Sequence, residues 1–206
     1  AALLLAMSLA QVFEPYFRLS LARSLSRSFS ALLSGVFAGS LEEIFFRGIL
    51  FKGMLRNGRL VRAVVLSSLF YSALHFVKPG EPYFVDGFDP LAGFRHLSYT
   101  FTSFLEPLQI LPGMFGLFLL GVVLSYAFFR TGNLYLAIGL HAGWIFGLKS
   151  VGVFGDYTRD DLGWLFGSTD PKIVSGVAAW IGIISVLMLV HWLTRNRCGL
   201  TSDQTP

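Results

Sequence analysis

Two adjacent carboxylates and an arginine, Glu42, Glu43 and Arg47, lie inside residues 31–51, a segment that is otherwise apolar enough to cross a lipid bilayer. A charged side chain at the middle of a membrane helix costs about 2.5–3.5 kcal/mol on an insertion scale. Three charges in one apolar segment therefore carry a large cost, and a functional site is the default explanation for retaining them.

The spacing of these charged residues predicts which of them form an ion pair. Glu43 and Arg47 are four residues apart, so on a helix they are neighbours and can form a buried ion pair. Glu42 is rotated by about 100° from Glu43, so it need not share the arginine. Glu42 is then free to face a cavity as a general base. The pair also fits a second interpretation, in which it is a buried structural strut.

Two histidines, His75 and His141, lie in two other apolar segments. One carboxylate and two histidines from three helices could converge on a water molecule. Deprotonated by Glu42, that water could attack a peptide carbonyl while a histidine stabilises the oxyanion. A lone helical histidine is also often a hydrogen-bonded packing residue, and we interpret His96 and His191 in that way.

The composition is that of a membrane protein. Of the 206 residues, 54% are hydrophobic and 14% are charged, whereas soluble domains carry about 25% charged residues. We predict an all-α, polytopic transmembrane bundle of about six or more helices, forming a single domain over 1–206. Six segments approach the roughly 20 apolar residues that span a bilayer: about 1–13, 31–51, 61–77, 108–129, 133–150 and 172–193.

The distribution of Lys and Arg predicts the orientation, because cytoplasmic loops hold the excess of these residues. Two connections and the tail are basic, through Lys52, Arg56, Arg59, Arg62, Arg130, Arg195 and Arg197. This pattern predicts a cytoplasmic C-terminus, with loops 78–107 and 151–171 outside. The formal net charge of +4 is then a property of loops, and it gives no reason to expect nucleic acid as a partner.

Two segments outside the predicted spans have a helical pattern. Residues 18–30 carry arginines four or five positions apart, which fits either an amphipathic helix in the membrane interface or a basic loop. The long loop 78–107 is predicted to contain a short helix over 91–106, half-buried among lipid headgroups.

Small residues predict where helices approach closely. One patch precedes the carboxylates, and a second lies on the segment that holds His141: Ser34, Gly35, Ala38 and Gly39, then Gly139, Gly143 and Gly147. Both patches predict helices packed in the interior of the bundle.

Taken together, the polar residues resemble the motifs of the CPBP family, the CAAX proteases of the Rce1-like type and the bacteriocin-processing (Abi) proteins. The first motif, EExxxR, is met in full by residues 42–47. The second, FxxxH, is met from Tyr71 to His75, with Tyr in place of Phe. The third, HxxxN, is met in part from His141 to Ile145, with Ile in place of Asn.

This resemblance covers residues 31–147, the predicted catalytic core, and implies a glutamate-dependent intramembrane endopeptidase without a cofactor. It implies a bacterial or archaeal cytoplasmic membrane, with the lipid bilayer and a membrane-associated peptide or protein substrate as partners. The implied roles are activation of water by Glu42 with His75, positioning of the first carboxylate by Glu43 and Arg47, and a contribution to the oxyanion hole by His141.

Ile145 has no hydrogen-bond donor, so half of the oxyanion stabilisation that the resemblance implies is missing. Removing one such donor typically costs about 2.7–4 kcal/mol of catalysis. Asn133 cannot replace it, because eight residues on a helix correspond to about 12 Å along the axis from His141. Trp144, a backbone N–H or a residue from another helix are the remaining candidates.

Two rival functions stay open. In the first, Glu42, His75 and His141 bind zinc, which commonly takes three protein ligands and a water molecule; the HExxH pattern of many zinc proteases does not occur. In the second, the protein is a non-catalytic immunity factor or assembly partner, which the isoleucine at position 145 favours. The substrate, whether a CAAX-type sequence or a bacteriocin-like peptide, is not identified by these residues.

Overall fold

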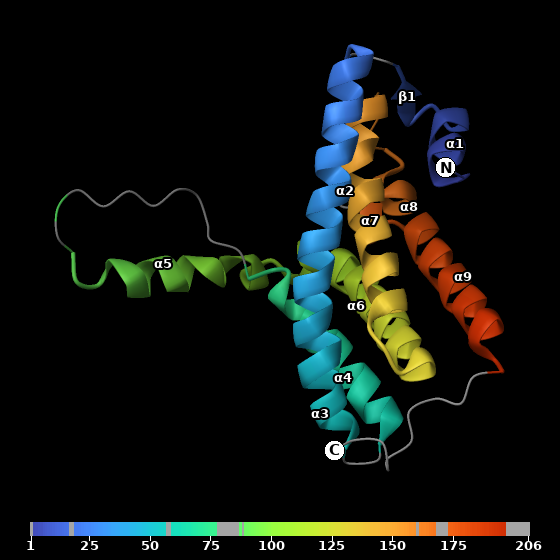
Figure 1. The fold of residues 1–206 in the computed structure, drawn as a ribbon. Helices are drawn as coiled ribbons and strands as arrows, with labels where there is room; N and C mark the ends of the chain where they lie inside the picture. Colours follow the sequence, from blue (N-terminus) through green and yellow to red (C-terminus); the bar gives the residue numbers. More distant parts are fainter. Residues whose placement is uncertain are drawn as a thin grey trace.

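Apolar helices form the body of the protein in the computed structural model (Figure 1). The structure describes residues 2–16, 19–56, 59–77, 87, 89–159, 161–167 and 173–196. Its elements are α1 (Ala2–Leu9), β1 (Phe13–Pro15), α2 (Leu21–Glu43), η1 (Ile44–Phe51), α3 (Lys52–Leu55), α4 (Leu60–Leu74), α5 (Ala92–Thr100), η2 (Thr102–Leu105), α6 (Pro107–Thr131), α7 (Tyr135–Phe154), β2 (Gly155–Tyr157), α8 (Gly163–Phe166), η3 (Ile173–Ser175) and α9 (Val177–Thr194).

Four helices in the described ranges are long and apolar enough to cross a membrane: the continuous helix Leu21–Leu55, α6, α7 and α9. The predicted all-α membrane bundle is therefore confirmed. Two of the six predicted spans are shorter than expected, because α1 has 8 residues and α4 has 15. At 1.5 Å per residue α4 extends about 22 Å, less than the roughly 30 Å of a hydrocarbon core.

Of the two expectations for the basic segment 18–30, the loop was wrong and the helix is confirmed, although it is not a separate helix; its place in the membrane interface stays a prediction. From Leu21 onward it forms the first turns of α2, which continues through η1 and α3 to Leu55. The sequence has no proline between Pro15 and Pro79, and therefore no residue in this stretch that lacks the backbone N–H of a helical hydrogen bond.

Helices α2 and α7 lie side by side (Figure 1), and small residues allow their backbones to approach. A Cβ atom added at Gly35 would lie 2.6 Å from the carbonyl oxygen of Ala142. One added at Gly39 would lie 3.3 Å from the Ala142 nitrogen. The first predicted patch of small residues is thus a packing surface.

The second predicted patch is not a packing surface of this kind. No atom lies within 4 Å of a Cβ added at Gly139, Gly143 or Gly147. Gly139 and Gly143 instead line an apolar groove of about 290 Å³ between α6, α7 and α9, together with Trp144 and Ile183. A regular spacing of glycines shows which face is small, but it does not show that a neighbouring helix covers that face.

Helices α4 and α6 are also joined through small polar residues. Ser67 and Ser125 place their hydroxyl oxygens 3.5 Å apart, and Ser72 Oγ donates a hydrogen bond of 2.6 Å to the Met114 carbonyl. A Cβ atom added at Gly121 would lie 2.9 Å from that of Ser68. This close contact brings the end of α4 to the middle of the bundle.

The described basic connections lie toward one end of the bundle, the end that holds α3, the turn between α6 and α7, and the end of α9 (Figure 1). Arg130 Nη2 there donates a hydrogen bond of 2.5 Å to the Thr194 carbonyl at the end of α9. The opposite end carries a short antiparallel pair of strands, β1 and β2, in which Glu14 pairs with Asp156. These strands were not predicted from the sequence.

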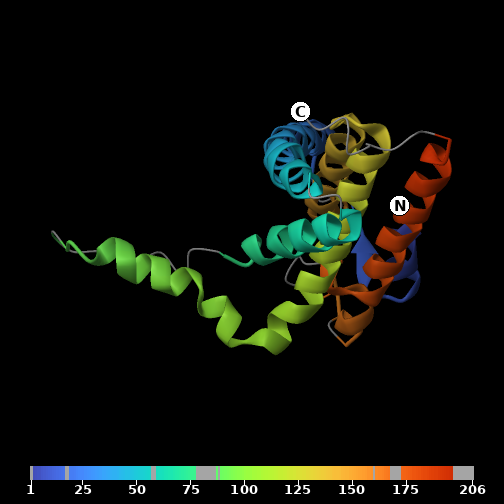
Figure 2. The same ribbon diagram turned by 90° about the horizontal axis from the view of Figure 1, so that it is seen from below.

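The helix predicted over 91–106 is present as α5 and η2, which extend away from the bundle in both views (Figures 1 and 2). Several large apolar side chains of α5 and its preceding residue are exposed, including Leu91, Phe94 and Leu97. Much of the rest of the predicted loop, residues 78–86 and 88, lies outside the described residues, as does the His96 side chain.

The close approach of α2 and α7 gives a first prediction. Gly35→Ala should destabilise the fold by about 1–3 kcal/mol, the usual cost of overpacking, because the new methyl group meets a backbone oxygen. Gly143→Ala is the matched control, since it meets open space and gains up to about 1 kcal/mol of helix propensity. Thermal unfolding in detergent would measure both, and equal melting temperatures for the two variants would contradict the packing described here.

Candidate active site

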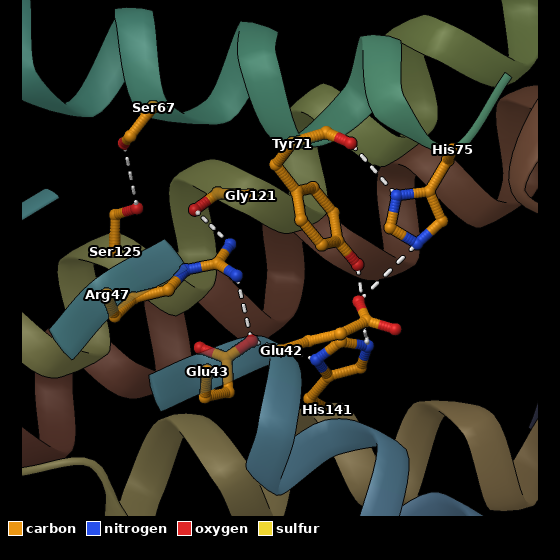
Figure 3. A network of polar contacts seen from close by, with 9 residues as sticks. All are labelled: Glu42, Glu43, Arg47, Ser67, Tyr71, His75, Gly121, Ser125 and His141. Carbon is orange, nitrogen blue, oxygen red and sulfur yellow. Dashed lines mark hydrogen bonds and ion pairs between the residues drawn. The ribbon is translucent and has the colours of Figure 1, made fainter. Parts of the chain in front are cut away.

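The five residues singled out from the sequence lie together in the bundle (Figure 3). Glu42 and Glu43 end α2, and Arg47 follows in η1. His75 lies directly after the last residue of α4, and His141 lies within α7. Three separate segments of the chain therefore supply one polar cluster.

Glu43 is the buried centre of this cluster. Its side chain is 0% exposed, and its Oε1 atom accepts two hydrogen bonds of 2.8 Å, from Arg47 Nη1 and from His141 Nδ1. The predicted ion pair between Glu43 and Arg47 is thus present, and His141 joins it. Because charge-assisted hydrogen bonds are stronger than neutral ones, Glu43 ties α7 to the end of α2.

Arg47 is held from several sides. Its Nη2 atom donates a hydrogen bond of 3.3 Å to the Gly121 carbonyl on α6. Its guanidinium carbon lies 4.6 Å from the ring centroid of Tyr71 and 5.7 Å from that of Phe46. A cation over an aromatic face is attracted by the ring, so Arg47 links η1 to both α4 and α6.

The helix changes its geometry at the site. The α-helical hydrogen bonds of α2 end at Glu43, and residues Ile44–Phe51 form a π-helix that contains Arg47. Most π-helical turns are short and many occur at functional sites. The widened turn begins directly after the two carboxylates, and nothing in the sequence analysis predicted it.

Glu42 faces the two histidines. Its Oε2 atom lies 3.6 Å from His75 Nε2 and 3.7 Å from His141 Nε2. The Glu42 and His75 side chains are 33% and 31% exposed, whereas His141 is nearly fully buried. The cluster is therefore closed at Glu43 and partly open at the Glu42 and His75 side chains, although the Glu42 Oε2 atom itself is buried.

Hydrogen bonds at the Nδ1 atoms of the two histidines determine which ring nitrogens carry a proton. His75 Nδ1 lies 2.9 Å from the backbone carbonyl of Tyr71, which can only accept, so this nitrogen carries the proton. His141 Nδ1 likewise donates to the Glu43 carboxylate. In the neutral form of each ring, Nε2 is then an acceptor that points toward Glu42.

The residues considered as replacements for the motif Asn lie elsewhere. Ile145 is half-buried one turn after His141. Trp144 packs in the apolar groove between α6, α7 and α9, so it is not placed to serve the cluster. Asn133 lies before α7, where its Oδ1 accepts a hydrogen bond from the Tyr135 nitrogen.

The structure adds one residue that the sequence analysis did not assign to the site. The Tyr71 hydroxyl lies 3.4 Å from His141 Nε2 (Figure 3). The sequence did carry a signal for this residue: Tyr71 replaces the Phe of the FxxxH motif and so introduces a hydroxyl group one helical turn before His75. His191 is bonded to the Tyr126 hydroxyl at 2.7 Å, far along α9, as expected for a packing histidine.

Within the described ranges, no group of three or more His, Cys, Asp or Glu side chains is arranged as a metal-binding cluster. The zinc hypothesis for Glu42, His75 and His141 remains a prediction that chelators can test.

The family of the chain follows from a comparison with known proteins. A family model for Rce1-like type II CAAX prenyl endopeptidases matches residues 23–147, more than half of the chain. The chain belongs to this family. The predicted resemblance is thereby confirmed, and the protein is an integral membrane protein of a protease family. Neither a curated protein nor a solved structure matches the chain significantly.

The buried ion pair of this family member gives a second prediction. Arg47→Leu should lower the free energy of unfolding by about 3–5 kcal/mol, because it leaves the Glu43 carboxylate buried without its cation. The yield of folded protein should fall as well. The double variant Glu43→Gln/Arg47→Leu removes both charges and should recover part of the loss. Size-exclusion chromatography and thermal unfolding in detergent would measure this. Normal folding of the single variant would show that the pair contributes little to the fold.

Proposed function

We propose that this membrane protease hydrolyses a peptide bond of a membrane-associated substrate with a water molecule activated by Glu42. One observation carries the proposal: Glu42 Oε2 lies within 3.7 Å of the Nε2 atoms of both His75 and His141. Atoms at this separation are slightly too far apart for direct hydrogen bonds, and a single water molecule can contact the carboxylate and a histidine together.

The reaction proceeds as a general base-catalysed hydrolysis. Glu42 accepts a proton from the water while the water oxygen bonds to the carbonyl carbon, and the carbonyl π electrons move to its oxygen. When the tetrahedral intermediate collapses, the C–N bond breaks and Glu42 transfers the proton to the leaving nitrogen. His75 Nε2 accepts the second water proton in a hydrogen bond and so orients the nucleophile.

The remaining charged residues position this machinery. Glu43 holds the His141 ring through Nδ1, and Arg47 neutralises Glu43. The adjacent carboxylates therefore have different environments, because Glu43 is fully buried and paired whereas Glu42 is accessible. This difference supports Glu42, rather than Glu43, as the base.

The substrate is proposed at the level of its class. The family name refers to CAAX prenyl endopeptidases, and the site lies within helices of membrane-spanning length. We propose a peptide that reaches the site from the membrane, either a CAAX-type C-terminus or another membrane-bound peptide. The basic end of the bundle supports a cytoplasmic C-terminus. A bacterial or archaeal membrane is proposed from the family resemblance.

The third prediction tests the general base. Glu42→Gln keeps the size of the side chain but cannot accept the proton, so turnover should fall by about 10²–10⁴-fold with normal folding. The assay is cleavage of quenched fluorescent peptides by purified protein in lipid vesicles. Glu14→Gln, on the exposed face of β1, is the control and should keep full turnover. Equal turnover for Glu42→Gln and the parent would refute the mechanism, and a biological role that survives this substitution would favour a non-catalytic protein.

A fourth prediction concerns metals. If Glu42 activates water directly, EDTA and 1,10-phenanthroline should leave the cleavage rate unchanged within about two-fold. Loss of activity with a chelator, restored by added zinc, would instead assign the same three side chains to a metal site.

A further inference from the structure

The neutral histidines present no proton to the place where Glu42 acts. His75 Nδ1 donates to the Tyr71 carbonyl and His141 Nδ1 donates to Glu43, so both Nε2 atoms are acceptors. Glu42 Oε2 is a third acceptor beside them. A tetrahedral oxyanion needs hydrogen-bond donors, and in this state the imidazoles supply none.

Arg47 does not supply the donor either. Its Nη1 atom is directed to Glu43 and its Nη2 atom to the Gly121 carbonyl. Ile145, one turn after His141, has an apolar side chain. Of the two described side chains that hydrogen-bond to His141, Tyr71 is the one with a hydroxyl group.

The Tyr71 ring is fixed in place. It is 1% exposed, and its centroid lies 5.0 Å from the Phe46 ring in an edge-to-face arrangement and 4.4 Å from the His75 ring. The Arg47 guanidinium lies 4.6 Å from its ring centroid, a cation–π contact that also holds the ring. A donor held rigidly before the reaction needs no reorganisation when charge develops.

The hydroxyl proton is only weakly held by His141. The contact between the Tyr71 oxygen and His141 Nε2 is 3.4 Å, longer than a typical hydrogen bond and therefore weak. Rotation about the single C–O bond redirects the proton while the ring stays in place. If His141 carries a second proton instead, its Nε2–H donates to the tyrosine oxygen and the hydroxyl proton again points elsewhere.

We propose that Tyr71 is a catalytic residue, whose hydroxyl group donates a hydrogen bond to the carbonyl oxygen of the scissile peptide as negative charge develops there. This inference rests on the proposed peptide hydrolysis by Glu42. It assigns to Tyr71 the donor that the isoleucine at position 145 does not provide.

The fifth prediction uses Tyr71→Phe, which removes one oxygen atom and keeps the ring contacts with Arg47 and Phe46. With a quenched fluorescent peptide that the parent cleaves, kcat should fall by about 10²–10³-fold, as for other oxyanion donors, while KM stays within about two-fold. A phosphinate analogue of that peptide, which mimics the tetrahedral intermediate, should bind more weakly by the same factor.

Tyr126→Phe is the matched control, because it removes another hydroxyl–imidazole hydrogen bond, that to His191, outside the cluster. It should leave kcat and binding of the analogue unchanged. Thermal unfolding of Tyr71→Phe should match that of the parent.

Three outcomes separate the proposals. Full turnover in Tyr71→Phe, with loss of turnover in Glu42→Gln, overturns the role of the tyrosine and leaves the general base intact. Reduced kcat with unchanged binding of the phosphinate also overturns it, because a structural defect would then explain the loss. Full turnover in both variants overturns both proposals.

Discussion

The structure depends on the burial of one carboxylate. Glu43 has no exposed surface, and its Oε1 atom accepts hydrogen bonds from both Arg47 and His141. Breaking such a buried pair costs about 3–5 kcal/mol, so the folded state strongly favours keeping both donors in place. Arg47 also bonds to the Gly121 carbonyl. The requirement to satisfy one charge therefore fixes the relative positions of α2, η1, α6 and α7, and with them the residues proposed to react.

The two neighbouring glutamates show how one sequence motif produces two different environments. Glu43 points into the closed side of the cluster, whereas Glu42, about 100° around the helix, is one-third exposed and faces both histidines. A carboxylate whose oxygen already accepts hydrogen bonds from an arginine and a histidine is a poor proton acceptor, since protonation would weaken both contacts. Glu42 instead lies 3.6 and 3.7 Å from the two histidine Nε2 atoms, which supports the proposed difference between a positioning carboxylate and a reacting one.

Much of this arrangement could be predicted from the sequence, because charges in apolar segments are informative. The Glu43–Arg47 pair followed from helical spacing and from the cost of burying charge. The convergence of Glu42 with the histidines was a possibility that the family motifs supported. The π-helix of η1 could not be predicted, since its hydrogen-bond pattern depends on tertiary contacts rather than on a recognisable residue. The course of α2 was also missed, because a basic helix and a basic loop have the same composition. The open glycine face of α7 was missed for a related reason: periodicity identifies a face but not its neighbour.

The packing of α2 against α7 is part of the chemistry as well as of the fold. A Cβ atom added at Gly39 would lie 3.3 Å from the Ala142 nitrogen and 3.6 Å from His141 Cβ. The absence of a side chain at this position lets the histidine approach the helix that carries both glutamates. The residues in this helix contact need only be small, but their smallness brings His141 within 2.8 Å of Glu43 and places its other nitrogen beside Tyr71. Close packing of small residues in a membrane bundle thus determines the separation of the groups proposed to hydrolyse the peptide.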